Sequence, residues 1–248
     1  MDHDNPFATG AGAGQDLHNV GDVMQPVAMD PMAILERCWD ILKKNPGTVI
    51  GTFLISAIPN CTTNVVNQGI QAGMEGADND TASLLLLAVM AVSLVGGLLG
   101  LFFQLGAVRV NTRLARGIDA EVSMMFGEAA HYLPAVAMVI VMGVAVMTGM
   151  LLLIIPGIVL SIGLQFSLYA MVDQGLGPIE AMKESWRLTD GHKITVVGVN
   201  IAIGLLTLLF GCVTLGLGMV ILAPLVSLTQ AVMYHSLMHL QGPRPRIV

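Results

Sequence analysis

The sequence is poor in charged residues, and this scarcity decides its class. Among 248 residues there are 11 Lys and Arg and 17 Asp and Glu, together 11% of the chain. A soluble domain carries about 25% charged residues, whereas 54% of this chain is hydrophobic and its mean hydropathy is +0.75. These values exclude a disordered chain, a nucleic-acid-binding protein and an ordinary soluble enzyme. They indicate an integral membrane protein.

Cysteine is also scarce and widely spaced. The three cysteines are Cys38, Cys61 and Cys212, and no C-x-x-C pair occurs. This spacing excludes a disulfide framework and a cysteine-based zinc site on sequence grounds. We interpret each cysteine as a small apolar packing residue and expect no cofactor.

The sequence patterns of common catalytic sites are missing as well. The chain has no phosphate-binding loop, no Ser-His-Asp arrangement and no paired carboxylates within its apolar segments. His235 and His239 are one helical turn apart, and His131 and His192 are expected at the same membrane level. Two such histidines chelate zinc only with a third ligand, so packing beneath the lipid headgroups is the favoured interpretation. We expect a non-enzyme, with a membrane-embedded enzyme using these histidines as the last hypothesis.

Four long segments contain no charged residue: 45–74, 81–108, 129–172 and 194–243. A spanning helix needs about 20 apolar residues, so the first two segments hold one crossing each. The last two hold two each, because Pro156-Gly157 and the glycine-rich stretch 211–218 provide turns. We therefore predict an all-α transmembrane domain over residues 31–240. Its six crossings are predicted at 48–70, 82–108, 134–155, 157–172, 194–213 and 217–239.

The basic residues test this count independently. Six crossings bring all 11 Lys and Arg to one side, where they precede the first crossing, follow the second, separate the fourth from the fifth and end the chain. The opposite side receives Glu75, Asp78 and Asp80. Because cytoplasmic loops carry the Lys and Arg excess, both termini are predicted to face the cytoplasm. Residues 1–30, with five Asp and no Lys or Arg, are expected to be a disordered cytoplasmic tail without a signal peptide, and residues 241–248 a second tail.

An amphipathic segment precedes two of the predicted hairpins. Pro31–Lys44 and residues 178–190 each combine an apolar stripe with a charged one, and a shift of 147 residues (186 minus 39) superposes Trp39 on Trp186, the only tryptophans. Residues 121–131 form a weaker third copy. The sequence thus predicts three repeats, each an interfacial amphipathic helix followed by a transmembrane hairpin. The apolar stripes are expected to be Ile34, Leu35, Cys38, Trp39 and Leu42 in the first helix, and Ile179, Met182 and Trp186 in the third.

Polar side chains within the apolar segments are few. Asn60, Asn64 and Asn67 share one helical face of the first crossing and are the candidate lining of a polar cavity. Gln104, Gln165, Asn200 and Gln230 are scattered over other crossings, where interhelical hydrogen bonds or a substrate path explain them equally well.

Residues 155–193 carry glycines, an acidic residue, a tryptophan and a Pro-Gly turn at fixed spacings. This stretch resembles a signature of bacterial multi-pass membrane proteins of mostly unknown function, a family that includes the membrane domain fused to some glycerophosphodiester phosphodiesterases. The resemblance implies a protein of the bacterial cytoplasmic membrane with no assigned activity, and the soluble phosphodiesterase domain is absent here. The matching residues are Pro156, Gly157, Phe166, Asp173, Gly175, Gly177, Ala181, Ser185, Trp186, Gly191 and His192.

Asp173 lies where the fourth crossing is predicted to end. A carboxylate there can accept hydrogen bonds from the first N–H groups of the helix that begins at Pro178. A proton- or ion-binding role is the alternative.

Two functional hypotheses follow. The leading one is a non-catalytic organiser of lipids or partner proteins through the cytoplasmic amphipathic helices, whose Lys and Arg meet anionic headgroups at about 1 kcal/mol each. The alternative is a small transporter or lipid-translocating protein with a cavity at Asn60, Asn64 and Asn67. Membrane lipids, with or without a protein partner, are the expected contacts, and no nucleic acid is expected.

Overall fold

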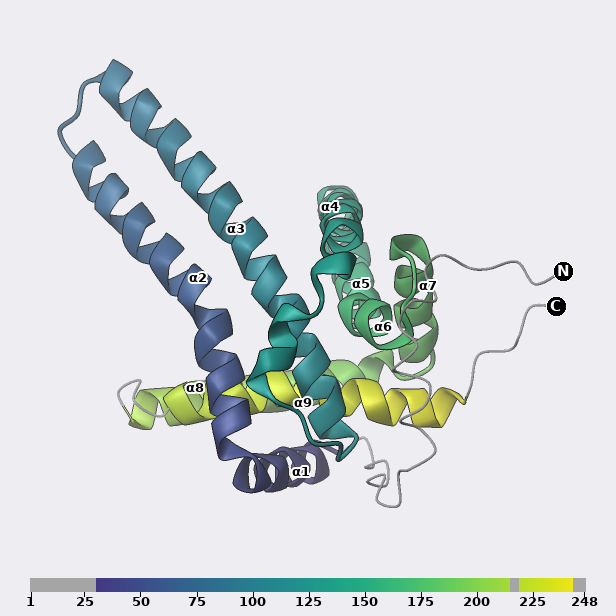
Figure 1. Cartoon of the computed structure of the whole chain (residues 1–248). Coiled ribbons are helices and arrows are strands. Elements are labelled where there is room, and N and C mark those ends of the chain that lie inside the picture. Colours follow the sequence, from purple (N-terminus) through teal and green to yellow (C-terminus); the bar gives the residue numbers. More distant parts are fainter. Residues whose placement is uncertain (1–29, 215–218, 243–248) are drawn as a thin grey trace, which may run out of the picture.

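The computed structural model describes residues 30–214 and 219–242, and all regular elements in these ranges are helices (Figure 1). Prolines and glycines set several boundaries: Pro31, Pro46 and Pro178 open helices, and Gly175 ends one with a φ of +64°. The elements are α1 (Pro31–Lys44), α2 (Pro46–Met74), α3 (Asn79–Ala115), η2 (Val122–Phe126), α4 (Ala129–Leu152), α5 (Ile154–Leu164), α6 (Ser167–Gln174), α7 (Pro178–Thr189), α8 (Lys193–Val213) and α9 (Met219–Gln241).

The chain is a membrane protein. Within the described ranges, five helical segments are long and apolar enough to cross a bilayer, namely Pro46–Met74, Asn79–Ala115, Ala129–Leu152, Ile154–Gln174 and Lys193–Val213. They correspond to the first five predicted crossings. Helix α9 corresponds to the sixth, and most of its described side chains are buried against other helices instead of facing outward.

Three hairpins leave a shared base in three directions (Figure 1). The α2–α3 hairpin is seen at nearly full length, α4 and α5 are strongly foreshortened in the same view, and α8 and α9 run across the foot of α2 and α3. We call the region where α1, α6, α7, α9 and the end of α3 meet the base. The membrane segments therefore diverge from the base and do not form a parallel bundle.

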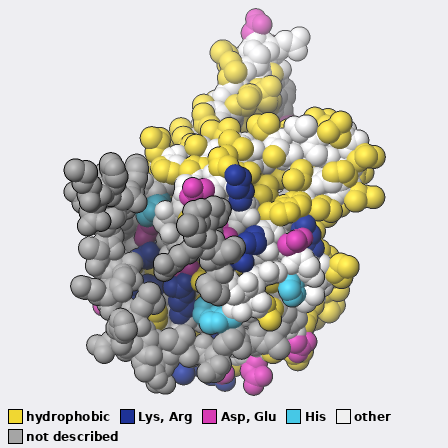
Figure 2. All heavy atoms as spheres, turned by 90° about the vertical axis from the view of Figure 1, so that its right-hand side faces the viewer, with side chains coloured by type: hydrophobic (Ala, Val, Ile, Leu, Met, Phe, Trp, Pro, Cys, Tyr) yellow, Lys and Arg dark blue, Asp and Glu magenta, His cyan; other side chains and the backbone are white. Residues whose placement is uncertain are grey.

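The protein core lies in the base. Fully buried side chains come from α1, η2, the second half of α3, α6 and α9, and include Ile34, Leu105, Met125, Met171 and Tyr234. Figure 2 shows basic, acidic and histidine side chains gathered on the lower part of the molecule, beneath a broad hydrophobic region. Helices α2, α3, α4 and α8 bury little of their apolar surface, as expected where lipid takes the place of protein around a helix.

Three local predictions differ from the structure. The turn between α4 and α5 is at Leu153, and Pro156 lies in the first turn of α5, where its missing N–H costs no helix hydrogen bond. The predicted amphipathic helix at 121–131 is instead the short η2 followed by the start of α4. The η2 backbone at Met125 lies so close to Gly106 of α3 that a side chain at Gly106 would collide with it, and this packing against α3 takes the place of an interfacial helix.

The third difference is a break in the fourth predicted crossing. α5 ends at Leu164 and α6 begins at Ser167. The segment is therefore discontinuous in the membrane-spanning part of the chain. Of the predicted tails, residues 1–29 and 243–248 lie outside the described residues.

Candidate functional site

The break between α5 and α6 is closed by side chains of α7. Ser185 Oγ accepts a hydrogen bond from the Phe166 N–H at 3.1 Å and donates one to the Gly163 carbonyl at 2.7 Å. Thr189 Oγ1 lies 3.5 Å from the same carbonyl. Backbone groups without partners are costly away from water, so α7 supplies the partners that the interrupted helix lacks.

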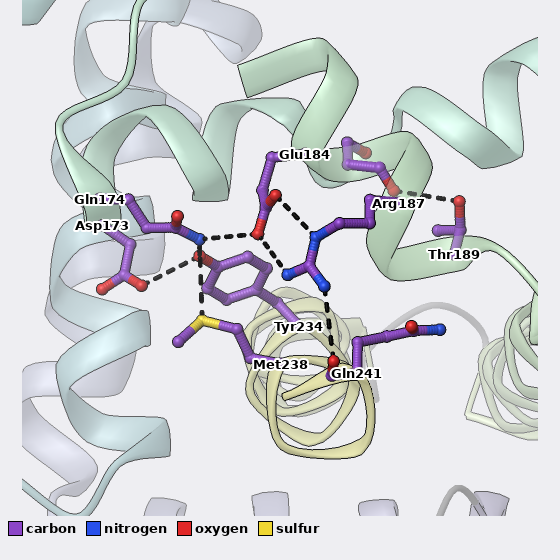
Figure 3. A network of polar contacts seen from close by, with 9 residues as sticks. Asp173, Gln174, Glu184, Arg187, Thr189, Tyr234, Met238 and Gln241 are labelled. Carbon is purple, nitrogen blue, oxygen red and sulfur yellow. Dashed lines mark hydrogen bonds and ion pairs between the residues drawn. The ribbon is translucent and has the colours of Figure 1, made fainter. Parts of the chain in front are cut away.

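Asp173, at the end of α6, joins three helices. Its Oδ2 forms an ion pair with Arg116 Nη2, just after α3. The same oxygen accepts a hydrogen bond from the Tyr234 hydroxyl of α9 at 3.0 Å (Figure 3). The Asp173 side chain is only 6% exposed. A buried carboxylate requires this kind of pairing. Asp173 thus binds α3 and α9, and not the N–H groups at the start of α7 that the sequence predicted.

A second carboxylate continues the network. Glu184 of α7 makes a bidentate pair with Arg187, at 2.8 Å for Nη2–Oε1 and 3.0 Å for Nε–Oε2. Hydrogen bonding to Glu184 raises the pKa of Arg187. Gln174 Nε2 lies 3.5 Å from Glu184 Oε1 and donates to the Tyr234 hydroxyl at 2.9 Å, which connects the two carboxylates (Figure 3). The network fixes α3, α6, α7 and α9 to one another.

Arg109 of α3 holds both ends of the α4–α5–α6 segment. Its Nε lies 3.5 Å from Glu128 Oε1, directly before α4, and its Nη1 donates to the Val172 carbonyl near the end of α6 at 3.3 Å. His131 Nδ1 is 2.8 Å from the other oxygen of Glu128. One guanidinium therefore contacts both the start and the end of this segment.

Helix α7 turns its small and polar side chains toward the protein. The buried side of α7 is formed by small and polar residues, including Ala181, Glu184 and Ser185, while Ile179 is 52% and Trp186 36% exposed. Figure 3 shows Glu184 and Arg187 within the polar network. Ile179 and Trp186 of the predicted apolar stripe thus face outward, as expected for an interfacial amphipathic helix, whereas Met182 packs against the core.

Helix α1 is arranged differently and buries most of its apolar stripe in the base. Ile34, Cys38, Ile41 and Leu42 are buried, but Trp39, which the sequence placed on the same stripe, is 44% exposed. Burial raises the pKa of the Cys38 thiol to about 11. Each amphipathic helix therefore fixes one face in the base and presents one tryptophan on the surface.

Both tryptophans carry an ammonium group over the ring. Lys43 Nζ lies 5.7 Å from the Trp39 ring centroid, and Lys193 Nζ lies 3.7 Å from that of Trp186. The Trp186 ring also packs directly against Gly163, beside the α5–α6 break. An indole with a cation above it is the pairing found where a protein meets headgroups and acyl chains together.

Three amides that the sequence left scattered form one chain. Gln230 Nε2 of α9 donates to Asn200 Oδ1 of α8 at 3.0 Å, and Asn200 Nδ2 donates to Gln165 Oε1 at the break at 3.1 Å. Gln165 Nε2 is buried and has no partner among the described residues. The sequence spacing of these residues does not predict the hydrogen-bond chain, because Gln165 lies at the break while Asn200 and Gln230 come from α8 and α9.

The predicted asparagine cluster lies along α2, inside and beside the α2–α3 hairpin. Asn67 Nδ2 donates to Ser93 Oγ of α3 at 2.9 Å, whereas Asn60 and Asn64 are exposed and donate to carbonyls one turn earlier on α2. A cavity of about 250 Å³ lies elsewhere, at the base. It is lined by Ile41, Lys44, Asn45, Leu114, Gly117, Ile118 and Asp119.

The four histidines do not converge. The His235 and His239 rings are 4.7 Å apart, but His131 pairs with Glu128, and His192 Nδ1 lies 3.2 Å from the Asp190 carbonyl. Over residues 30–214 and 219–242, no three His, Cys, Asp or Glu side chains are arranged to hold a metal ion.

The other motif residues have backbone roles. Gly157 contacts α4, Gly177 precedes the first turn of α7, and Gly175 and Gly191 have positive φ values of +64° and +75°. These positions shape the turns around α6 and α7.

One family matches the chain. The sequence profile of a family described as Domain of unknown function (DUF7847) matches residues 32–242. No curated protein and no solved structure matches.

Proposed function

We propose that this chain, which belongs to the DUF7847 family of unknown function, is a non-catalytic membrane protein that organises lipids through α1 and α7. The observation that carries the proposal is the pair of outward tryptophans with lysines over their rings. Each pair combines an aromatic ring for the acyl boundary with a cation for an anionic headgroup. The alternative is that this surface binds a partner protein, and the experiment below distinguishes the two.

The proposed orientation has both termini in the cytoplasm of a bacterial cell, with six membrane segments arranged as three hairpins, two of which follow an amphipathic helix. Its support is the distribution of charge: α1, α7 and the end of α3 hold Lys and Arg at the base, while Glu75, Asp78 and Asp80 are at the far tip of α2–α3. The order α1–α2–α3 and α7–α8–α9 supports the repeat, since each has one amphipathic helix before one hairpin.

The base offers a second lipid contact. The lining of the cavity of about 250 Å³ includes Lys44 at the end of α1 and Asp119 in the segment after α3. Opposite charges beside an opening of this size suit a headgroup that carries both charges. The cavity and the tryptophan–lysine pairs supply polar and apolar contacts on one side of the protein.

Mass spectrometry of lipids retained in native-lipid nanodiscs tests the proposal. Wild-type protein is expected to retain anionic lipid above its share in the bulk membrane. One lysine near an anionic surface contributes about 1 kcal/mol, so K193Q should lower this enrichment by up to about fivefold. K183Q, which removes an exposed lysine of α7 that is not stacked over a tryptophan ring, is the matched control and should lower it less.

Two results would overturn the lipid assignment. Unenriched lipid together with a stoichiometric protein would make the chain an organiser of partner proteins. A single retained small molecule would instead favour a carrier.

The carrier alternative has one observation in its favour, the amide chain that ends at the buried, unpartnered Gln165 Nε2. Substitution of Asn60, Asn64 and Asn67 by Leu tests the cavity first predicted for it. A carrier that uses these asparagines loses uptake in proteoliposomes, whereas a lipid organiser keeps its lipid enrichment.

A further inference from the structure

The tip of the α4–α5 hairpin, residues 151–155, consists of aliphatic side chains that no part of the described protein covers. Their exposed fractions are 84% for Leu151, 74% for Leu152, 68% for Leu153, 68% for Ile154 and 74% for Ile155. The tip of α2–α3 has the opposite chemistry. It carries Glu75, Asp78 and Asp80, and the Thr81 hydroxyl donates to Asp78 at 2.6 Å.

The α4–α5 turn needs few partners from water. The Leu153 N–H donates to the Gly149 carbonyl at 3.1 Å, the Gly157 N–H donates to the Leu153 carbonyl at 3.4 Å, and Pro156 has no N–H. A side chain at Gly149 would come within 3.1 Å of the Gly157 backbone, so the two legs meet closely just below the turn. Backbone N–H and carbonyl groups inside hydrocarbon must find their hydrogen-bond partners within the protein. This turn leaves few of its backbone groups without one.

The legs of the hairpin are equally self-sufficient. Between residues 133 and 164 the only side chains with a hydrogen-bonding group are Thr148 and Ser161. Thr148 donates to the Val144 carbonyl and Ser161 to the Ile158 carbonyl, both at 2.8 Å and both within their own helix. No polar side chain of the hairpin therefore requires contact with the far side of the bilayer.

The hairpin starts and ends at one level, and its direction differs from that of α2–α3. Arg109 contacts Glu128 before α4 and the Val172 carbonyl near the end of α6. In Figure 1, α4 and α5 point largely along the line of sight while α2 and α3 extend across the view. A bilayer crossed by α2–α3 is therefore entered obliquely by α4–α5, and an oblique hairpin reaches less deep.

We propose that the α4–α5 hairpin enters the bilayer from the base and ends within the hydrocarbon, so that lipid acyl chains cover residues 151–155. The third and fourth predicted crossings then form a re-entrant hairpin. All Lys and Arg still lie on one side of the membrane in this arrangement. A hairpin that returns to its own side leaves every later loop on the same side as two full crossings would.

Cysteine accessibility in nanodiscs tests the proposal, since both bilayer faces are open to water there. The variants L152C and D78C are compared in a background with C61S and C212S, and Cys38 remains because it is fully buried. A membrane-impermeant maleimide should label D78C at least on the order of tenfold faster than L152C. I155C repeats the measurement at the other end of the tip, and denaturation in detergent should make every site reactive.

A membrane-permeant fluorophore on the same cysteines then identifies what covers the tip. Nitroxide groups on lipid acyl chains should quench the probe at residue 152 strongly and the probe at residue 78 weakly. Equal maleimide rates at the two sites would show a tip in water and overturn the proposal. Protection of L152C without quenching would show that protein, such as a second copy of this chain, covers the tip, and would overturn it as well.

Discussion

The α2–α3 and α4–α5 hairpins are both apolar and both long enough to cross a bilayer, yet they end in opposite ways. One tip carries three acidic residues, and the other carries five exposed aliphatic residues. Moving a Leu or Ile side chain from hydrocarbon to water costs about 1.5–3 kcal/mol when exposure is complete. Exposing all five tip residues to water on the far side of the bilayer would therefore cost several kcal/mol, although the helices are long enough to reach that side. The turn, and not the length, distinguishes the two hairpins.

The hairpins also differ in what holds their legs. Thr63 of α2 packs directly on Gly96 of α3, and Asn67 bonds to Ser93, so α2–α3 is joined by its own side chains. The second leg of α4–α5 continues into α6 only through a break that α7 closes. The two legs of α2–α3 are therefore joined by contacts between α2 and α3 themselves, whereas the connection from α5 to α6 needs hydrogen bonds from α7.

A charge at each tip gives the largest expected difference. L152K should abolish most of the membrane-inserted protein, because a lysine in the hydrocarbon costs about 3 kcal/mol. A77K, in the polar tip of α2–α3, is the matched control and should insert normally. The carbonate-resistant fraction after expression measures both, and equal yields would mean that the two tips share one environment.

Removal of the bridge across the break should come next. S185A leaves the Phe166 N–H without its acceptor and should lower stability by about 1–3 kcal/mol. S161A removes a hydroxyl that bonds only within α5 and should change little. Thermal unfolding in nanodiscs compares the two variants, and similar midpoints would show that the break does not depend on α7.

The close approach of α4 and α5 predicts a smaller loss. A Cβ at Gly157 would come within 2.5 Å of Met150 Cγ and 2.8 Å of its backbone N, whereas Gly143 has open space. G157A should therefore destabilise the protein by about 1–2 kcal/mol, and G143A should not. The same unfolding assay applies, and a G157A variant as stable as G143A would mean that the hairpin legs are not in contact.

The smallest effect concerns the polar tip. The Thr81 hydroxyl lowers the pKa of Asp78, which means that the hydrogen bond favours the charged carboxylate. Its contribution is present above the ordinary pKa and is lost as pH falls through the lowered one. T81A should move the Asp78 titration upward, toward the ordinary value, in a ¹³C NMR titration of the carboxyl group. S83A, whose hydroxyl bonds to the Asp80 carbonyl, should leave it unchanged.

Long uncharged runs made the positions of the membrane helices predictable. Predicted crossings 48–70, 82–108 and 194–213 fall inside α2, α3 and α8, because a run without charge limits where a membrane helix can begin and end. The helical spacing that placed Asn60, Asn64 and Asn67 on one face does not reveal that Ser93 is the partner of Asn67.

The site itself needed tertiary structure. The break at Gln165 depends on Ser185, which lies 20 residues later, and no local pattern connects the two. Amphipathicity identified α7 and its two stripes, and the exposure of Ile179 and Trp186 is the one expected for apolar side chains that face lipid. A polar stripe facing inward needs buried partners, which only the fold supplies to Glu184.

The α7 closure of the break also has a consequence for synthesis. Segments α5 and α6 leave the ribosome ahead of Ser185 and Thr189, so the open backbone at Phe166 must wait for residues that emerge later. Until α7 arrives, water at the bilayer surface is the available partner for this N–H. Residues 165–174 are therefore expected to remain at that surface during translation and to dock only after α7 has emerged, before Tyr234 of α9 completes the network.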